Sequence, residues 1–304
     1  MGLGAIASAL RSTTGRGVGP LLPKLWERLV KMDKEERRPK DDGWHISGIS
    51  SLCPREMALK YLFPQPAEAE AWEPRSLMRL DVGSAVHEWW QNRYLGPANI
   101  LMGDWQCKGV CRKTWKMSLM PARVCDCGGP IEYSELRVKD AVTGIVGSTD
   151  GILLLDGGRY GFDLKTSNVD SMERLKFPYE SHVMQLNLYM HLLNLKQGLL
   201  VYVDPVCKFW RESKGRTASQ GLETLPVLEF IIPYEPKWWD MAVMKVTEAK
   251  KLVEEIKAKT WNGPLPMRIC ESDRSFRAQD CSSCQDCFAF DVEQRVAEAL
   301  AVKK

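Results

Sequence analysis

Two aspartates and a lysine fall close together in the stretch GSTDGILLLDGGRYGFDLKT, residues 147–166. Two carboxylates a few ångströms apart repel each other unless a cation lies between them. Oxygen ligands of this kind suit Mg²⁺ or Mn²⁺, which keep several waters and also bind phosphate oxygens. A lysine beside them can stabilise charge that develops on a phosphate or help a water lose its proton. Asp150, Asp163 and Lys165 therefore have the composition of a phosphodiester-hydrolysis site, and the alternative is a hairpin with an ordinary polar outer face.

The turn between the two predicted strands decides whether these side chains meet. If residues 156–157 form a two-residue loop, Asp150 lies directly opposite Asp163. If residues 157–158 form the loop, Asp150 lies opposite Lys165. Opposed residues share a face of the sheet, so both registers gather the three side chains, whereas a three-residue loop separates them. We expect an even-numbered loop.

Three further residues extend the pattern on both sides. GSAVHEWW (83–90) puts His87 on a predicted helix, and QLNLY (185–189) puts Gln185 and Tyr189 one turn apart on another. In order, His…G-x-x-D…D-x-K…Q-x-x-x-Y resembles the RecB-family branch of the PD-(D/E)xK nucleases. The residues that carry this resemblance are His87, Asp150, Asp163, Lys165, Gln185 and Tyr189.

The resemblance implies a fold and a set of roles. The fold is α/β, with a PD-(D/E)xK restriction-endonuclease-like core in which helices flank a mixed sheet. The resemblance makes His87, Asp150 and Asp163 ligands of the catalytic Mg²⁺ or Mn²⁺, and makes Lys165 the residue that assists the attacking water. It places Gln185 and Tyr189 along the DNA path or in support of the site. Glu135, on the preceding strand, is a further candidate because many relatives have a glutamate there.

Two sequence segments resemble the ends of the iron–sulfur subset of this family, which includes the CRISPR-associated RecB-like exonucleases and the AddB nuclease domain. They are SSLCPREMALKYLF (50–63) and DCSSCQDC (280–287). In that subset one cysteine before the core and three after it hold a [4Fe–4S] cluster, which implies a C-terminal clasp of Cys53, Cys281, Cys284 and Cys287. The last gap is shorter than in relatives, and Cys270 is near enough to compete as a ligand. Zinc bound by the same four thiolates would form an equally closed site, with every coordination position filled by the protein.

A second group of cysteines has the spacing C-x₃-C-x₁₃-C-x-C and comprises Cys107, Cys111, Cys125 and Cys127. Four thiolates on two knuckles resemble a zinc ribbon, although both knuckles depart from the usual C-x₂-C. We expect a zinc-ribbon-like insertion at 104–131 stapled by Zn²⁺. Tryptophans and basic residues around it can stack bases and grip phosphate, so a contact with DNA is left open. Cys207 has no partner in this pattern and is expected to be a plain buried thiol.

The remainder of the chain is expected to supply the scaffold. Apolar periodicity predicts helices over 77–94, 182–195 and 240–259, and strands over 145–155, 159–166, 199–203 and 227–233. Residues 1–43 are expected to form a basic, flexible N-terminal arm. Residues 44–304 are expected to form the nuclease domain, with the metal-cluster clasp at 270–290.

Composition limits the partners of this chain. In 304 residues, 42 Lys and Arg against 39 Asp and Glu give a net charge of +3, so DNA must be held by local basic patches. No apolar run approaches the roughly 18–20 residues that span a bilayer, so no membrane partner is expected. Clustered cysteines suit a reducing compartment, so a cytoplasmic location is expected.

The sequence therefore predicts a Mg²⁺- or Mn²⁺-dependent deoxyribonuclease. We expect a single-strand-preferring exonuclease that acts in DNA replication, recombination or repair. Its partners would be DNA and a separate helicase or recombination protein, since the chain has no P-loop motif. The alternative is a catalytically silent DNA-end-binding or recruitment module that keeps the nuclease fold. A structural zinc or iron–sulfur subunit of a larger machine is a third reading.

Overall fold

The computed structural model describes residues 24, 27, 28, 31, 43–62, 74–206, 227–258, 260, 270 and 287. The chain divides into two compact units, residues 1–41 with 65–84, and residues 42–64 with 85–304. In the first unit the described residues are four helical positions between 24 and 31 and the first part of helix α5 (Pro74–Trp89). The predicted N-terminal arm thus lies largely outside the described residues. The elements below belong to the second unit, apart from that first part of α5.

The main sheet has seven strands and is mixed. Its order is β10 (Val227–Pro233), β9 (Gln197–Val203), β8 (Gly158–Thr166), β7 (Gly151–Leu155), β2 (Leu101–Cys107) and β3 (Thr114–Ser118), with β4 (Ile131–Ser134) paired to β2. Strands β8 and β9 run parallel, and the other neighbours run antiparallel. A parallel pair needs a crossover, which α6 (Val169–Arg174) and α7 (Glu180–Leu192) supply here.

A second sheet of three strands continues from the main one. It comprises β1 (Trp44–His45), β6 (Ile145–Thr149) and β5 (Leu136–Lys139). Strand β6 is followed by β7 after the single residue Asp150, so the chain passes from one sheet to the other at this position. The candidate carboxylate thus marks the junction of the two sheets.

The two faces of the main sheet pack against different helices. Phe162 and Leu164 of β8 lie in one apolar cluster, against which Val86 and Trp90 pack. These two residues come from α5 and from the π-helix η1 (Trp90–Leu95) that continues it. On the other face Leu186 and Met190 of α7 pack with Leu200 of β9 and Ile152 of β7. Asp163 and Lys165 alternate with Phe162 and Leu164 along β8, so they point toward α7.

Two glycines let α7 approach the sheet closely. A Cβ at Gly198 would lie 2.8 Å from Leu186 Cδ2, and one at Gly161 would lie 3.1 Å from Met190 Cγ. The close approach brings the polar residues at the start of α7 next to the end of β8. Glycine on the strands therefore sets the distance between the lysine and the helix that faces it.

A helical layer packs around α3 (Ile46–Ser51), α4 (Pro54–Leu62), α7 and α8 (Pro236–Ala258). Lys245 of α8 is buried, and its Nζ donates hydrogen bonds to the carbonyl oxygens of Ile49 at 2.9 Å and Leu52 at 3.2 Å. These carbonyls lie at the end of α3, where backbone acceptors lack intrahelical partners. A buried lysine thereby fixes the segment that leads into Cys53.

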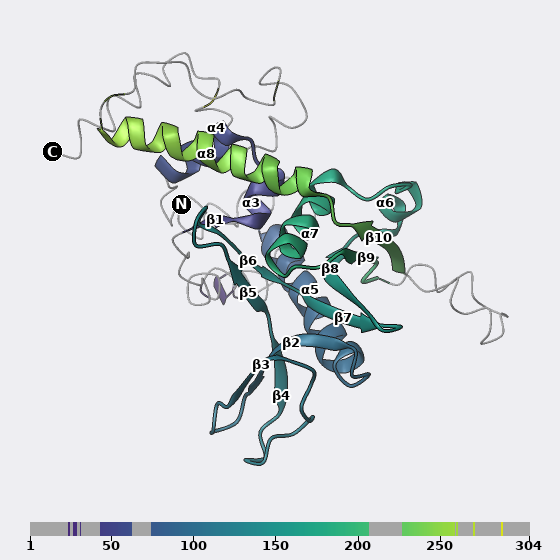
Figure 1. Cartoon of the computed structure of the whole chain (residues 1–304). Coiled ribbons are helices and arrows are strands. Elements are labelled where there is room, and N and C mark those ends of the chain that lie inside the picture. Colours follow the sequence, from purple (N-terminus) through teal and green to yellow (C-terminus); the bar gives the residue numbers. More distant parts are fainter. Residues whose placement is uncertain are drawn as a thin grey trace. The chain divides into compact units, whose positions relative to one another are not determined.

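Strands β2, β3 and β4 form a ribbon that extends away from the main sheet (Figure 1). Leu101 and Met102 of β2 pair with β7, whereas Trp105 further along β2 pairs with Trp115 of β3 and Tyr133 of β4. One continuous strand therefore links the main sheet to the cysteine-rich insertion predicted at 104–131.

Most of the predicted elements are confirmed. The predicted strands at 159–166, 199–203 and 227–233 match β8, β9 and β10, and the helices at 182–195 and 240–259 match α7 and α8 to within four residues. The prediction of a single strand over 145–155 is wrong, because the strand is interrupted at Asp150 and divides into β6 and β7. Gly151 has φ +132°, a backbone conformation that favours glycine and ends the strand there. Within the described ranges no helix is both long and apolar enough to cross a membrane.

Candidate active site

The turn of the β7–β8 hairpin sets the position of the carboxylates. Asp156 and Gly157 have φ +48° and +77°, the left-handed pair of a two-residue type I′ turn. Leu155 consequently pairs with Gly158, and Gly151 pairs with Phe162. One step further in this register places residue 150 opposite residue 163. The predicted even-numbered loop is confirmed.

Asp150 is held on three sides. Its Oδ2 accepts a hydrogen bond from the backbone N–H of Leu164 at 2.8 Å, so the carboxylate stands in for a backbone acceptor at the end of the ladder. Its Oδ1 lies 3.0 Å from His87 Nδ1, and Gln91 Nε2 donates to its carbonyl oxygen at 3.3 Å. Only 8% of Asp150 is exposed. The carboxylate therefore has one fixed position, set jointly by β8 and by the helix α5–η1.

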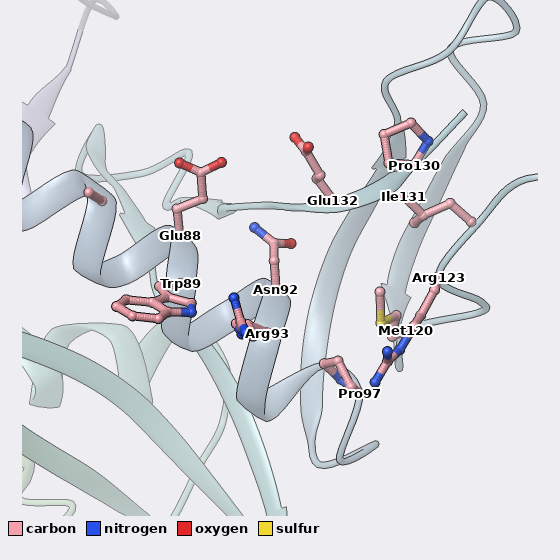
Figure 2. A pocket seen from close by; sticks show the side chains of 11 residues that line it. Glu88, Trp89, Asn92, Arg93, Pro97, Met120, Arg123, Pro130, Ile131 and Glu132 are labelled. Atoms are coloured by element: carbon pink, nitrogen blue, oxygen red, sulfur yellow. The ribbon is translucent and has the colours of Figure 1, made fainter. Parts of the chain in front are cut away.

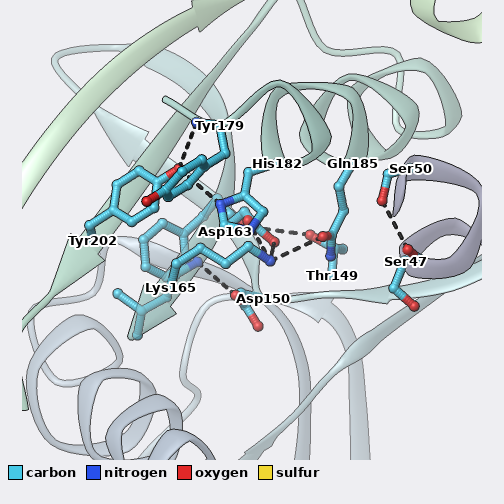
Figure 3. A network of polar contacts seen from close by, with 12 residues as sticks. Ser47, Ser50, Thr149, Asp150, Asp163, Lys165, Tyr179, His182, Gln185 and Tyr202 are labelled. Carbon is cyan, nitrogen blue, oxygen red and sulfur yellow. Dashed lines mark hydrogen bonds and ion pairs between the residues drawn. The ribbon is translucent and has the colours of Figure 1, made fainter. Parts of the chain in front are cut away.

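Asp163 and Lys165 form a buried ion pair on the face toward α7 (Figure 3). The Lys165 Nζ lies 2.9 Å from Oδ2 and 3.2 Å from Oδ1 of Asp163, and it donates to Gln185 Oε1 at 3.1 Å. Asp163 is 2% exposed, and no donor is aligned to its Oδ2 among the described residues. Burial raises the pKa of Asp163 to about 6, although the Lys165 ammonium lowers it. A buried carboxylate with an open lone-pair direction is suited to a cation.

Tyr189 lies on α7, one turn after Gln185. It is 3% exposed and hydrogen-bonds with Gln185. A Cβ at Gly147 would lie 2.9 Å from Tyr189 Cε1 and 3.0 Å from Ile46 Cδ1. The glycine of the G-x-x-D pattern is therefore explained by packing: only a residue without a side chain admits the tyrosine and α3 at this point.

Glu135 lies near the same tyrosine. It is exposed and immediately precedes Leu136, whose partner in β6 is Thr149. Burial raises the pKa of Tyr189, and the charges of Asp163, Asp150 and Glu135 raise it further. Three carboxylates thus act on one hydroxyl, which makes this end of the two sheets an electronegative site.

His87 reaches the site from the opposite face of the main sheet. It lies on α5, whereas Asp163 points toward α7, so His87 contacts Asp150 directly and Asp163 is held by Lys165. Burial lowers the pKa of His87, but the hydrogen bond to Asp150 and the nearby carboxylate charges outweigh it and the net shift is upward. The structure brings the six predicted residues together as two linked pairs, His87–Asp150 and Asp163–Lys165, with Gln185 and Tyr189 beside the second pair.

His182 and Tyr202 belong to the site and were missed in the sequence. His182 Nδ1 lies 2.8 Å from the Tyr202 hydroxyl, and Tyr202 is the β9 partner of Lys165. Burial, together with the charge of Lys165, lowers the pKa of His182 to about 4. The imidazole therefore stays neutral beside the ammonium. The signal that could have revealed His182 is its spacing, because residues 182, 185 and 189 share one face of α7.

A divalent cation fits the first of these pairs best. In octahedral coordination at about 2.0–2.1 Å, neighbouring ligand atoms are about 3 Å apart. His87 Nδ1 and Asp150 Oδ1 have this separation, and Asp163 supplies a buried carboxylate oxygen nearby. The ligand atoms of the predicted set, His87, Asp150 and Asp163, do not, however, all lie within 4.8 Å of one another. In the described part of the chain, the group of three or more His, Cys, Asp or Glu side chains whose ligand atoms all lie within 4.8 Å is formed by four cysteines.

These four cysteines are Cys107, Cys111, Cys125 and Cys127, the predicted ribbon set, and they converge at the tip of the ribbon. The Sγ atoms of Cys107 and Cys127 are 3.4 Å apart, and those of Cys111 and Cys125 are 3.6 Å apart. Tetrahedral zinc with Zn–S bonds of about 2.3 Å requires S···S distances of about 3.8 Å. The donor set and its spacing therefore fit a closed zinc site.

The backbone around this site also favours thiolates. The N–H groups of Cys111 and Gly129 lower the pKa of Cys127 to about 6. A Cβ at Gly109 would lie 2.8 Å from Gly129 Cα and 3.0 Å from Cys127 Sγ. The two knuckles thus pack glycine against glycine, which lets backbone donors reach the sulfurs.

The C-terminal clasp lies mostly outside the described residues. Cys281 and Cys284 are not described, and Cys270 is half-buried. Cys53 is buried, and Arg55 Nη1 lies 3.8 Å from Cys287 Sγ. Position 287 is therefore beside the segment that carries Cys53, although 232 residues separate it from Arg55.

Comparison with known proteins gives no closer assignment. No protein-family model matches the chain, and no curated protein matches it in sequence. Similar solved structures include an alkaline exonuclease from Laribacter hongkongensis, at 11% identity and TM-score 0.44, covering 71% of this chain and 92% of that one. A phage-related exonuclease from Haemophilus somnus 129PT has 15% identity and TM-score 0.40, covering 78% of this chain and 94% of that one. The structure of SSO0001 has 15% identity and TM-score 0.42, covering 81% of this chain and 89% of that one. Similarities of this size assign neither a family nor an activity, so the function must be argued from the site.

Proposed function

We propose that this protein is a Mg²⁺- or Mn²⁺-dependent DNA nuclease with a PD-(D/E)xK core that hydrolyses phosphodiester bonds. The observation that carries the proposal is the placement of Asp150, Asp163 and Lys165 at one end of a register-locked hairpin. Gln185 from the crossover helix holds the lysine. A polar hairpin face with no function would not bury a carboxylate to 2% exposure beside a second one.

Lys165 acts on the reacting group. An ammonium has three N–H donors, and Asp163 and Gln185 accept two of them among the described residues. The third can donate to the attacking water or to a phosphate oxygen as negative charge develops there. Because Gln185 and Asp163 fix Nζ in advance, the donor needs no reorganisation during the reaction.

His87, Asp150 and Asp163 would hold the divalent cation. When bound, this ion supplies Lewis-acid stabilisation of the charge on the phosphate. The Leu164 N–H would keep the Asp150 carboxylate in place, and Gln91 would hold the backbone carbonyl of the same residue. Tyr189 and the neutral His182 lie on the same face of α7 as Gln185, which holds Lys165. Glu135, at the exposed margin, would contact substrate or a water beside the site.

The finer properties of the activity are part of the same proposal. We propose a single-strand-preferring exonuclease that acts in DNA replication, recombination or repair, with any helicase motor on a separate protein. The ribbon cysteines would bind Zn²⁺. Cys53, Cys281, Cys284 and Cys287 would bind a [4Fe–4S] cluster that clasps the two ends of the core.

The nuclease is tested with DNA labelled at either end, incubated with Mn²⁺, Mg²⁺ or EDTA. Wild-type protein should cut with either metal and not with EDTA, and the label lost first gives the polarity. Lys165→Ala should lose at least about a hundredfold in rate, the contribution of one such group. Lys196→Ala, an exposed lysine between α7 and β9, is the matched control and should cut normally. Cutting by Lys165→Ala at wild-type rate would show that the site is wrongly assigned. Absence of cutting with every metal while DNA binding persists would favour the recruitment module.

The clasp is tested by metal analysis of protein purified without air. Wild-type protein should contain iron and sulfide, and Cys284→Ser should lose both. Cys207→Ser, a cysteine outside both sequence groups, should keep them. Iron-free wild-type protein with two equivalents of zinc would replace the cluster with a second zinc site.

A further inference from the structure

A groove of about 730 Å³ lies between the helix α5–η1 and the cysteine ribbon, and the nuclease site does not use it. The helix contributes one wall, and the β3–β4 connection with the start of β4 contributes the other (Figure 2). The charged, amide and aromatic side chains that line the groove are Glu88, Trp89, Asn92, Arg93, Arg123 and Glu132.

The groove and the nuclease site share one helix. Ala85, Glu88, Trp89 and Asn92 recur at three- and four-residue steps and line the groove. His87 and Gln91, one turn apart on a face roughly 130° further around the same helix, bind Asp150. A molecule in the groove therefore lies within a turn of helix from the residue that contacts the first carboxylate.

The groove presents one exposed aromatic ring, that of Trp89, which stacks on Tyr94 next to the groove. Trp89 is 52% exposed and Tyr94 is 50% exposed, and their rings stack at 6.0 Å between centroids with 22° between planes. The Arg93 guanidinium lies 5.6 Å from the centre of the Trp89 ring. Exposed aromatics interleaved with arginine are the means by which proteins hold single-stranded nucleic acid, since every base offers a face to stack.

The polar side chains divide between the two ends of the groove. In Figure 2, Glu88, Asn92 and Glu132 lie toward one end, and Arg93 and Arg123 lie toward the other. Carboxylates repel phosphate but accept hydrogen bonds from the N–H groups of bases, whereas guanidinium groups bind phosphate. This division suits a strand whose bases face the acids and whose backbone faces the arginines.

The walls are fixed before anything binds. The N–H of Tyr133 in β4 donates to Asn92 Oδ1 at 2.6 Å, which ties the ribbon wall to the helix wall. The four-cysteine site closes the far end of the same ribbon. A preformed groove loses little conformational entropy on binding, which favours affinity.

We propose that this groove binds single-stranded DNA, with a base stacked on Trp89 and phosphates on Arg93 and Arg123, and that it leads the strand toward Asp150. This inference rests on the proposed nuclease function and names the surface that would hold its single-stranded substrate. The ribbon is then one wall of the substrate path, and its metal keeps that wall in place.

The test measures binding of short fluorescein-labelled oligo(dT) by anisotropy in EDTA, so that nothing is cleaved. Trp89→Ala should weaken Kd by at least about fivefold, the lower end of the effect of removing one base-stacking ring. Tyr61→Ala removes a ring of similar exposure, 54%, that lies on α4 outside the groove, and it should bind as wild type does. Equal Kd values for Trp89→Ala and wild type would overturn the proposal.

Salt dependence tests the arginines separately. Arg123→Gln should reduce the slope of log K against log salt by about 0.7, the value for one phosphate contact on a single strand. Glu132→Gln alters the same wall without removing a cation and should leave the slope unchanged. An unchanged slope in Arg123→Gln would show that this side chain contacts no phosphate and would overturn its assignment.

The two proposals fail in distinguishable ways. If wild type binds oligo(dT) through Trp89 but cuts with no metal, the groove stands and the nuclease is wrong. If wild type cuts and Trp89→Ala binds and cuts equally well, the nuclease stands and the groove is wrong. Duplex DNA that binds more tightly than oligo(dT), with the same loss in Trp89→Ala, would overturn the single-strand assignment.

Discussion

Two properties of Asp163, its burial and its negative charge, oppose each other when no metal ion is bound. Its carboxylate is almost completely buried, and its charge is compensated by one ammonium, Lys165. Its pKa is raised to about 6, so protons and cations compete for the same oxygens near neutral pH. The proposed catalytic residue is thereby also the residue that makes cation binding depend on pH.

The first prediction concerns this competition. Mn²⁺ should raise the Tm of the protein by an amount that grows as pH rises through about 6, because the folded protein releases the Asp163 proton over that range. The raised pKa of His87 acts in the same direction, since only its neutral ring can bind a metal. Thermal unfolding at several pH values, with EDTA as reference, measures the shift. Asp163→Asn should lose the part of the pH dependence that Asp163 contributes and keep the part due to His87. A wild-type shift of the same size at every pH would contradict the assignment.

The second prediction concerns Gly147. Gly147→Ala should lower the free energy of unfolding by about 1–3 kcal/mol, the cost of overpacking. Its Cβ would meet Tyr189 at 2.9 Å and Ile46 at 3.0 Å. Gly48→Ala is the control: its Cβ would meet Leu52 at 3.7 Å within a helix, so it should be neutral or stabilising. Denaturant unfolding measures both, and equal stability of Gly147→Ala and wild type would show that Tyr189 is not packed there.

Among the elements, α8 stabilises the entry to the core through one buried lysine. Lys245→Met should destabilise the protein by about 1–3 kcal/mol for each acceptor left without a donor. The two acceptors are the carbonyls of Ile49 and Leu52. Lys251→Met changes a lysine of the same helix whose side chain is 75% exposed, and it should have almost no effect. Unfolding in urea compares the two variants, and equal midpoints would remove Lys245 from this role.

The elements also show what the sequence could and could not predict. The period of two along β8 separates Asp163 and Lys165 from Phe162 and Leu164, and the turn chemistry of Asp156 and Gly157 sets the register; both are local properties. The break at Asp150 is not local, because it depends on Leu164 donating to a side chain from another strand.

Tertiary packing determined the other features that were missed. His182 becomes part of the site only because β9 places Tyr202 opposite Lys165. The separation of His87 from Asp163 arises because their supporting helix and strand face lie on opposite sides of the main sheet. The resemblance to a nuclease family implied that these residues belong to one site, but could not predict how they pair.

Across the whole second unit, β2 connects the cysteine site with the main sheet. Trp105 and Cys107 at one end of β2 lie in the same buried cluster as Phe162, Leu164 and Val201. The ribbon is therefore not an independent appendage. If the ribbon binds zinc as proposed, loss of that zinc should destabilise the strand that carries Asp163.

The fourth prediction follows from this connection. Cys125→Ser should remove about one zinc per chain, because a closed site needs all four thiolates. It should also lower the Tm of the whole cooperative unit. Metal analysis and calorimetry test both effects, with Cys207→Ser as the control that keeps zinc and Tm. A Cys125→Ser protein that lacks zinc but melts at the wild-type temperature would show that the ribbon unfolds separately.

In the proposed nuclease, Asp150 would serve both the chemistry and the fold, since its side chain completes the strand ladder at Leu164 while it faces His87. Natural selection can therefore keep an aspartate at this position in descendants that no longer cut DNA. Among the described residues, the Lys165 side chain hydrogen-bonds only to Asp163 and Gln185, so no contact in the strand ladder there would preserve it after activity is lost. Among homologous chains, the lysine is thus the better marker of a working enzyme, and an aspartate at position 150 marks only the inherited fold.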